Sequence, residues 1–286
     1  KIKGASPAQL FLGNGSDEAI DLLFRAFCNP GQDNVILLPP TYGMYGVSAA
    51  INGVEVRNVP LTPDFQLQPE KILAAADAQS KILFICSPNN PSGNAVKRED
   101  ILFLLENFPG IVVVDEAYID FSETASLLTV LNQHPNLLVM QTLSKAWGLA
   151  SLRLGMAFAN PELIRVLNQI KPPYNISGLT QETVLSALQN KGKVDEFIQL
   201  ILEEREFLRK ELEKLPYILR VHPSDANFLL VQVPDANRFY DGLIEEKVIV
   251  RNRSTVLHCE GCLRITVGTR DETLALLQAF EKIATN

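Results

Sequence analysis

The chain has 286 residues, of which 47% are hydrophobic and 21% charged, a composition that allows a buried core and excludes a wholly disordered chain. Its net charge of −7 argues against non-specific binding of nucleic acid, because that binding depends on basic surface. No apolar run approaches the roughly 18 residues that a membrane-spanning helix needs, so no membrane segment is expected.

The chain alternates between helical and strand patterns as far as about residue 160. Apolar residues recur at helical spacing in 17–27 and 101–108. Short apolar runs typical of buried strands lie at 35–38, 54–59, 81–86, 111–114, 137–140 and 154–159. Strands separated by helical segments predict an α/β fold, with a mostly parallel central sheet flanked by helices. Ligands bind such sheets at the carboxyl ends of the strands.

The rest of the chain has a different pattern. It predicts a long charged helix over 193–214, strands at 227–233, 248–250 and 263–267, and helices at 237–246 and 271–283. This order is typical of a smaller α+β C-terminal domain. We place the boundary near Pro172 and Pro173. The large domain would then cover 1–172, and a long connecting helix with the small domain 173–286.

Four cysteines, at positions 28, 86, 259 and 262, are too few and too scattered for a disulfide framework, which is typical of a cytoplasmic protein. Cys259 and Cys262 form a CxxC motif beside His258, but a zinc site usually needs a second pair of ligands. We therefore expect incidental thiols and no bound metal.

Lys145 follows an apolar run and stands among small and apolar residues. In a desolvated pocket the pKa of a lysine amine falls from about 10.4, and the amine becomes a nucleophile that can form a Schiff base with an aldehyde cofactor. A single lysine in a loop is more often a solvated surface residue. Arg153, a few residues on, carries a guanidinium group suited to a phosphate.

Asp115 follows the apolar run 111–114 directly. A buried carboxylate is costly unless a cation pairs with it, and the protonated ring nitrogen of pyridoxal phosphate is such a cation. Tyr118, three residues on, could donate a hydrogen bond to the phenolate oxygen of the same ring. The simpler alternative is a buried carboxylate that only caps a loop.

Three further features follow predicted strands. The turn 87–93 contains two prolines and a glycine and could hold the amide of Asn90 in one orientation. The segment 13–18 leads into a helix whose free N–H groups could bind an anion, or it is an ordinary helix cap at Ser16 or Asp17. Tyr42 could stack on a planar ring, although a lone tyrosine is more often part of a core or surface.

The order of these features resembles the fold-type I pyridoxal-phosphate aminotransferases, the aspartate aminotransferase superfamily. The motifs that match are SPNNPSG (87–93), DEAY (115–118) and TLSK (142–145), followed by Arg153. The resemblance covers nearly the whole chain. It implies that the chain is an aminotransferase with a lysine-bound pyridoxal phosphate.

The resemblance also implies a role for each matching residue. Lys145 would be the Schiff-base lysine and general base, Asp115 the partner of the ring nitrogen, and Tyr118 a further catalytic residue. The residues expected to contact the cofactor are Ser16, Asp17, Tyr42, Asn90, Asp115, Tyr118, Thr142, Ser144, Lys145 and Arg153.

Within the superfamily the chain is most similar to the histidinol-phosphate aminotransferases, in PPTYGMY (39–45), Arg251 and GCLRITVGT (261–269). This similarity implies histidinol phosphate and 2-oxoglutarate or glutamate as substrates, in histidine biosynthesis. Arg251 and Arg264, with Asn227 as a weaker candidate, would form the substrate site. It also implies a homodimer with active sites at the interface, and an N-terminal segment ahead of the present start that would contribute to the site.

Other functions remain open at this stage. An aromatic or broad-specificity aminotransferase, or a threonine-phosphate decarboxylase, would share the cofactor residues and differ at the substrate end. A regulator that has lost catalysis is a different class, and the acidic charge argues against one that binds DNA. A nucleotide-binding protein is disfavoured, because the sequence contains neither GxGxxG nor GxxxxGK[ST].

Overall fold

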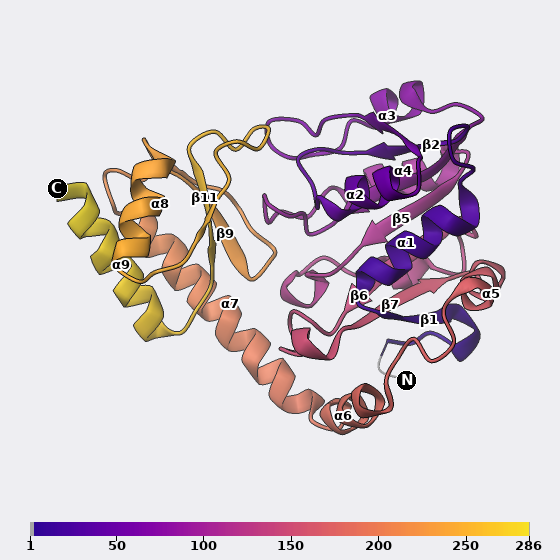
Figure 1. Cartoon of the computed structure of the whole chain (residues 1–286). Helices are drawn as coiled ribbons and strands as arrows, with labels where there is room; N and C mark the ends of the chain where they lie inside the picture. The colour runs from indigo at the N-terminus through magenta and orange to yellow at the C-terminus, as the bar shows by residue number, and fades with distance from the viewer. Residues whose placement is uncertain (1–2, 286) are drawn as a thin grey trace.

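Two β-sheets organise the chain, and the computed structural model describes residues 3–285 (Figure 1). The large sheet has the strand order β1-β7-β6-β5-β4-β2-β3. Its strands are β1 (Leu10–Asn14), β2 (Asn34–Leu37), β3 (Glu55–Asn58), β4 (Ser80–Cys86), β5 (Ile111–Asp115), β6 (Leu137–Thr142) and β7 (Leu154–Ala159). The predicted α/β fold with a mostly parallel sheet is confirmed, since β3, β2, β4, β5 and β6 pair in parallel.

Strand β7 runs against its neighbours and pairs in antiparallel fashion with both β6 and β1. Its amino end therefore lies at the same edge of the sheet as the carboxyl ends of the other strands. Arg153, which directly precedes β7, reaches the predicted ligand edge for this reason. The sequence patterns did not identify β1, the edge strand that begins the sheet.

Both faces of the large sheet are covered by helices, and each face has its own core. Alternate strand residues point to opposite faces, so Leu83 and Ile85 of β4 join one apolar cluster while Ile82 and Phe84 join the other. The helices of this part of the chain are α1 (Ser16–Phe27), α2 (Met44–Ile51), α3 (Pro69–Ala75), α4 (Arg98–Asn107) and α5 (Pro161–Ile170). Phe24 of α1 stacks on Phe84 with the ring centroids 5.6 Å apart, which fixes α1 against the sheet.

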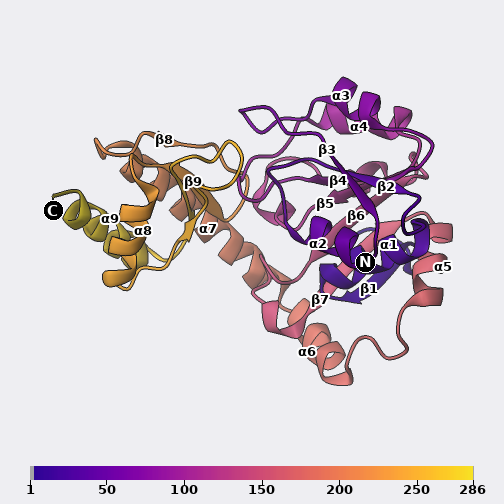
Figure 2. The same ribbon diagram turned by 45° about the horizontal axis from the view of Figure 1, so that its top comes forward.

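The small sheet is antiparallel, with the order β10-β11-β9-β8. Its strands are β8 (Arg220–Val221), β9 (Phe228–Gln232), β10 (Arg251–Asn252) and β11 (Cys262–Thr266). After α6 (Gly178–Leu188), the long α7 (Lys191–Glu213) runs to this sheet, where α8 (Ala236–Glu245) and α9 (Arg270–Thr285) complete its core (Figures 1 and 2). No helix within residues 3–285 combines the length and apolar character needed to cross a membrane.

The predicted strand at 248–250 is wrong. Val248 donates its backbone N–H to the carbonyl of Leu243 at 2.8 Å, and Lys247 has a positive φ of 63°, so the chain is still leaving the last turn of α8. Ile249 is 79% exposed, and strand pairing begins only at Arg251. The apolar composition of 248–250 therefore predicted a strand two to three residues before the pairing of β10 with β11 begins.

Two contacts fix the small sheet against the large one. Asp225 accepts a hydrogen bond from the N–H of Ala95 at 2.8 Å and donates its own N–H to the carbonyl of Gly93 at 2.7 Å. Gly93 has a φ of 88°, and a Cβ there would lie 2.6 Å from the hydroxyl of Ser224, so glycine permits this close approach. On α7, Arg205 donates to the carbonyl of Phe121, in the segment after β5, at 3.3 Å and to that of Ala226, just before β9, at 2.8 Å. The domain boundary at Pro172 and Pro173 stays a prediction.

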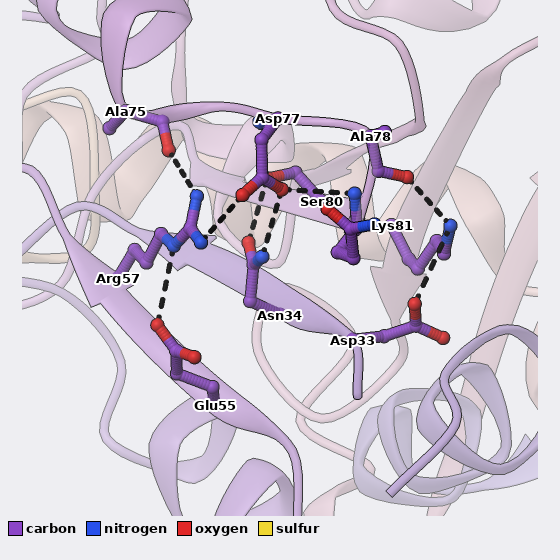
Figure 3. A network of polar contacts seen from close by, with 10 residues as sticks. Asp33, Asn34, Glu55, Arg57, Ala75, Asp77, Ala78, Ser80 and Lys81 are labelled. Atoms are coloured by element: carbon purple, nitrogen blue, oxygen red, sulfur yellow. Dashed lines mark hydrogen bonds and ion pairs between the residues drawn. The ribbon is translucent and has the colours of Figure 1, made fainter. Parts of the chain in front are cut away.

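A polar network joins the amino ends of β2, β3 and β4, at the edge opposite to the predicted site (Figure 3). Asp77 is its centre: the carboxylate accepts a hydrogen bond from Asn34 at 3.1 Å and pairs with Arg57 at 2.7 Å. The hydrogen bond from Asn34 and then the pairing with Arg57 lower the pKa of Asp77 to about 2. The charged form of Asp77 therefore stabilises the fold above its unfolded pKa of about 3.9, and this contribution is lost as the pH falls toward 2.

We predict that Asp77→Asn lowers the urea midpoint of unfolding at pH 7. Below about pH 4 the difference between the midpoints of this variant and the unmodified chain should become smaller, because the carboxylate of Asp77 becomes protonated in that range. Urea denaturation followed by circular dichroism from pH 7 to pH 3 measures both effects.

Asp64→Asn is the matched control, because Asp64 makes a single exposed ion pair with Arg220 at 3.2 Å, with 78% of the Asp64 side chain exposed. Exposed pairs contribute little, so this variant should keep the midpoint of the unmodified chain. Equal midpoints for Asp77→Asn and Asp64→Asn would contradict the prediction.

Candidate active site

Most of the predicted site residues lie at one edge of the large sheet. Asp115 is the last residue of β5, Thr142 ends β6, and Asn90 lies in the loop that follows β4. Arg153 reaches the same edge from the amino end of the reversed β7. These residues therefore share the edge at which parallel sheets commonly bind ligands.

Asp115 is a buried carboxylate, with 4% of its surface exposed. It accepts hydrogen bonds from the hydroxyl of Tyr45 at 2.7 Å and from the backbone N–H of Ala117 at 3.1 Å. Burial raises the pKa of Asp115, and these two hydrogen bonds oppose the rise. Between residues 3 and 285, no lysine, arginine or histidine lies within ion-pair distance of this carboxylate. The site thus presents a negative group that lacks a cation.

The sequence patterns did not identify Tyr45 as a site residue. It is fully buried on α2, and its ring stacks on Phe84 with centroids 4.7 Å apart. Burial and the nearby charge of Asp115 raise the pKa of Tyr45, so its hydroxyl keeps its proton and donates it. The sequence signal that could have indicated Tyr45 is its spacing from Tyr42, because residues three apart can face the same side. In the structure the two rings meet edge to face, with their centroids 5.5 Å apart.

Lys145 lies over the ring of Tyr118, with its Nζ 5.2 Å from the ring centroid. Desolvation by the surrounding protein lowers the pKa of this amine, and the positive charge of Arg264 lowers it further. The charge of Asp115 acts in the opposite direction. Although the side chain is exposed, its amine is therefore easier to deprotonate than that of an ordinary surface lysine.

The small sheet contributes to the same group of side chains. Arg264 of β11 donates a hydrogen bond to the Oδ1 atom of Asn90, and its guanidinium lies 4.9 Å from the ring centroid of Phe228. The ring of Tyr118 packs edge to face on Phe228 at 5.2 Å. Burial raises the pKa of Tyr118 to about 12, so its hydroxyl is a hydrogen-bond donor at neutral pH.

A second group of polar side chains gathers beside β6, β7 and the start of α1. Tyr42 donates a hydrogen bond to Asp17 at 3.1 Å, and Asp17 lies 3.6 Å from the guanidinium of Arg153. The hydroxyl of Thr142 donates to that of Ser144 at 3.0 Å. Burial, followed by the charge of Asp17, raises the pKa of Tyr42.

This second group has the character of an anion site. Gly15 has a φ of 78°, and a Cβ there would lie 2.3 Å from the guanidinium of Arg153, so the glycine leaves room for that cation. The hydroxyl oxygen of Ser16 is buried and has no hydrogen-bond partner within residues 3–285. Both lie at the amino end of the twelve-residue α1, where free N–H groups favour an anion.

The three predicted substrate residues come from the small sheet. Arg251 of β10 pairs directly opposite Arg264 of β11, and its side chain is exposed. Asn227 directly precedes Phe228, and its carbonyl accepts a hydrogen bond from Val267 at 3.0 Å. No set of three metal-binding side chains occurs within the described part of the chain, and all four cysteines are free and buried.

Comparison with known proteins bears on this geometry. The family described as Aminotransferase class I and II matches residues 1–280. The chain belongs to the class I and II aminotransferases. A histidinol-phosphate aminotransferase from Cytophaga hutchinsonii is 55% identical to this aminotransferase over 280 residues, which cover 98% of the chain and 80% of the relative.

Solved structures share the fold of the aminotransferase. A histidinol-phosphate aminotransferase from Sinorhizobium meliloti, in complex with pyridoxal 5′-phosphate, matches with a TM-score of 0.89 at 23% identity, covering 99% of this chain and 78% of that one. L-threonine-O-3-phosphate decarboxylase from Porphyromonas gingivalis matches with a TM-score of 0.84 at 21% identity. The match covers 100% of this chain and 86% of the decarboxylase. These similarities confirm the predicted fold type.

The aminotransferase depends on pyridoxal phosphate, as its family does, and its residues fit that cofactor. Asp115 lacks the cation that the protonated ring nitrogen would supply. Arg153 and the unpartnered hydroxyl of Ser16 lie where a phosphate would satisfy both. Lys145 lies beside Tyr118 with an amine whose pKa is lowered. The sequence prediction of the cofactor is confirmed, while the roles of single residues stay predictions.

We predict that Tyr45→Phe raises the Kd for pyridoxal phosphate about tenfold, because a hydrogen bond to a charged group contributes about 1.5 kcal/mol. The ring still packs on Phe84, but Asp115 loses its side-chain donor. Titration of the cofactor-free chain with pyridoxal phosphate, followed by absorbance, measures the Kd.

Tyr217→Phe is the matched control. The ring of Tyr217 stacks on that of Phe239 in the core beside the small sheet, with the ring centroids 5.8 Å apart. Its hydroxyl is buried and has no hydrogen-bond partner within the described residues. The control should bind the cofactor as the unmodified chain does. The same Kd for Tyr45→Phe and the unmodified chain would rule out the role of this hydroxyl.

Proposed function

We propose that this aminotransferase exchanges an amino group between histidinol phosphate and 2-oxoglutarate, forming imidazole acetol phosphate and glutamate, as a step of histidine biosynthesis. The name and the 55% identity of the Cytophaga relative support this substrate. The observation that carries the proposal is the position of Arg264 against Asn90, beside Tyr118 and Lys145. This guanidinium, which has no carboxylate partner in the described part of the chain, can bind the anionic end of a substrate while the amine end meets Lys145.

The cofactor would be held at both of its ends. Asp115 would keep a proton at the ring nitrogen, with Tyr45 holding the carboxylate in place. Asn90 and Tyr118 would donate hydrogen bonds to the phenolate oxygen. The residues proposed to surround the phosphate are Ser16, Asp17, Thr142, Ser144 and Arg153. When bound, pyridoxal phosphate supplies an electron sink for the charge that develops on the substrate carbon.

Lys145 would both hold the cofactor covalently and move protons once the substrate amine has replaced it. Its lowered pKa increases the fraction of neutral amine, which can accept a proton from the substrate carbon as a general base. The same amine would then act as a general acid and give the proton to the C4′ carbon of the cofactor, not back to the substrate carbon. The ring of Tyr118 lies beside the amine, with its centroid 5.2 Å from Nζ.

The substrate arginines have to serve two different anions. Histidinol phosphate presents a phosphate, whereas glutamate and 2-oxoglutarate present a carboxylate. A guanidinium group can bind either one through two parallel hydrogen bonds. Arg264 and the opposing Arg251 are proposed for this double role, and Asn227 is a further candidate for substrate contact.

The test compares histidinol phosphate with phenylalanine and threonine phosphate, with 2-oxoglutarate as acceptor. We expect kcat/KM for histidinol phosphate to exceed that for phenylalanine by about 100-fold or more, since two charge-assisted contacts contribute about 3 kcal/mol. Glutamate formation and carbon dioxide release, measured separately, distinguish transamination from decarboxylation. A preference for phenylalanine would indicate an aromatic aminotransferase, and carbon dioxide from threonine phosphate a decarboxylase; either result would refute the proposal.

We also propose a cytoplasmic homodimer. The four free thiols suit a reducing compartment. A cavity of about 760 Å³ lies beside α6, and its lining contains none of Lys145, Asp115 or Tyr118. Tyr174 on its rim is 96% exposed, and such open apolar surface is typical of a face that a second copy covers. A single-chain mass in sedimentation experiments would contradict the dimer.

A further inference from the structure

One face of the β10–β11 pair carries three arginines. Arg251 lies directly opposite Arg264, so both side chains leave the same face of the pair. Arg253 donates its backbone N–H to the carbonyl of Cys262 at 2.9 Å, which continues the pairing by one residue beyond Asn252. Since alternate residues of a strand share a face, Arg253 points to the same side as Arg251. This is the side on which Arg264 contacts Asn90.

These arginines lack negative partners. No carboxylate within residues 3–285 pairs with Arg251, Arg253 or Arg264 at ion-pair distance. The Nε groups of Arg253 and Arg264 are both buried and without a hydrogen-bond partner in the same range. Buried donors that remain unsatisfied cost stability, and a bound anion would remove that cost.

The three charges also act on one another. Burial lowers the pKa of Arg264, and the charges of Arg253 and Arg251 lower it further. Burial raises the pKa of Tyr118, and the charge of Arg253 is among those that oppose the rise. Arg253 is therefore close enough to the proposed active site for its charge to act on Arg264 and Tyr118. Like charges held together without a counterion are typical of a site that binds an anion of high charge.

We propose that Arg253 is a third phosphate-binding residue, which favours substrates ending in a phosphate monoester over substrates ending in a carboxylate. This inference rests on the proposed function. A phosphate monoester carries a charge between about −1.5 and −2 at neutral pH and has three terminal oxygens, whereas a carboxylate carries −1 and has two oxygens. Arg251 and Arg264 suffice for the carboxylate, and a third guanidinium matches the additional charge and oxygen of the phosphate.

The experiment compares Arg253→Gln and Arg253→Lys with Arg165→Gln in the holoenzyme. Arg165 is exposed on α5, away from the small sheet, and its replacement makes the same change in net charge. For Arg253→Gln we expect the KM for histidinol phosphate to rise about tenfold or more, as for the loss of a charge-assisted hydrogen bond. The kcat and the KM for glutamate should stay within about twofold, Arg253→Lys should recover part of the loss, and Arg165→Gln should match the unmodified enzyme.

The pH dependence provides a second readout, which a purely structural role of Arg253 would not alter. The second ionisation of a phosphate monoester has a pKa of about 6. In the unmodified enzyme the KM for histidinol phosphate should fall as the pH rises from 5.5 to 7, and in Arg253→Gln this fall should be smaller. An unchanged KM for histidinol phosphate in Arg253→Gln, or an equal rise in the KM for glutamate, would overturn the inference.

Inhibition by inorganic phosphate separates this inference from the proposed function. In the holoenzyme we expect phosphate to compete with the amine substrate and its Ki to rise about tenfold in Arg253→Gln, whichever amine the enzyme uses. If threonine phosphate replaces histidinol phosphate as substrate and the Ki still rises, the proposed function fails and the role of Arg253 stands. If the Ki is the same in both enzymes, the role of Arg253 fails.

Discussion

The site depends on one buried carboxylate at the end of a central strand. Asp115 is 4% exposed and receives hydrogen bonds from Tyr45 and Ala117, neither of which carries a positive charge. A buried anion without a cation raises the free energy of the folded state. A ligand that places a positive charge beside Asp115 lowers that free energy, so cofactor binding should stabilise the folded chain.

The topology of the large sheet explains why the other groups meet near this carboxylate. β5 lies at the middle of the strand order, with β6 and β4 on either side. The reversed direction of β7 carries Arg153 to the same edge, and β1 delivers the start of α1 and Ser16 there. The small sheet then adds Arg264 through its contact with Asn90, because Asp225 contacts Ala95 and Arg205 contacts Phe121 across the two parts of the chain.

Much of this arrangement could be predicted from the sequence, because apolar runs mark the buried strands and polar motifs follow them. That pattern predicted Asp115, Asn90 and Lys145 as site residues and gave the correct fold class. It could not give the antiparallel edge strand β1, the position of Tyr45 or the common face of Arg251 and Arg253, since these follow from pairing register and packing. The strand expected at 248–250 failed because a helix end and a strand can share the same apolar composition.

The central claim is that the amine of Lys145 and the carboxylate of Asp115 serve a single bound pyridoxal phosphate. Reduction with borohydride at one equivalent of cofactor, followed by digestion and mass spectrometry, identifies the lysine that holds it. We expect the pyridoxyl label on Lys145, and much less label in Asp115→Ala, where the ring nitrogen has lost its partner. A label on another lysine, or equal labelling in Asp115→Ala and the unmodified chain, would contradict the claim.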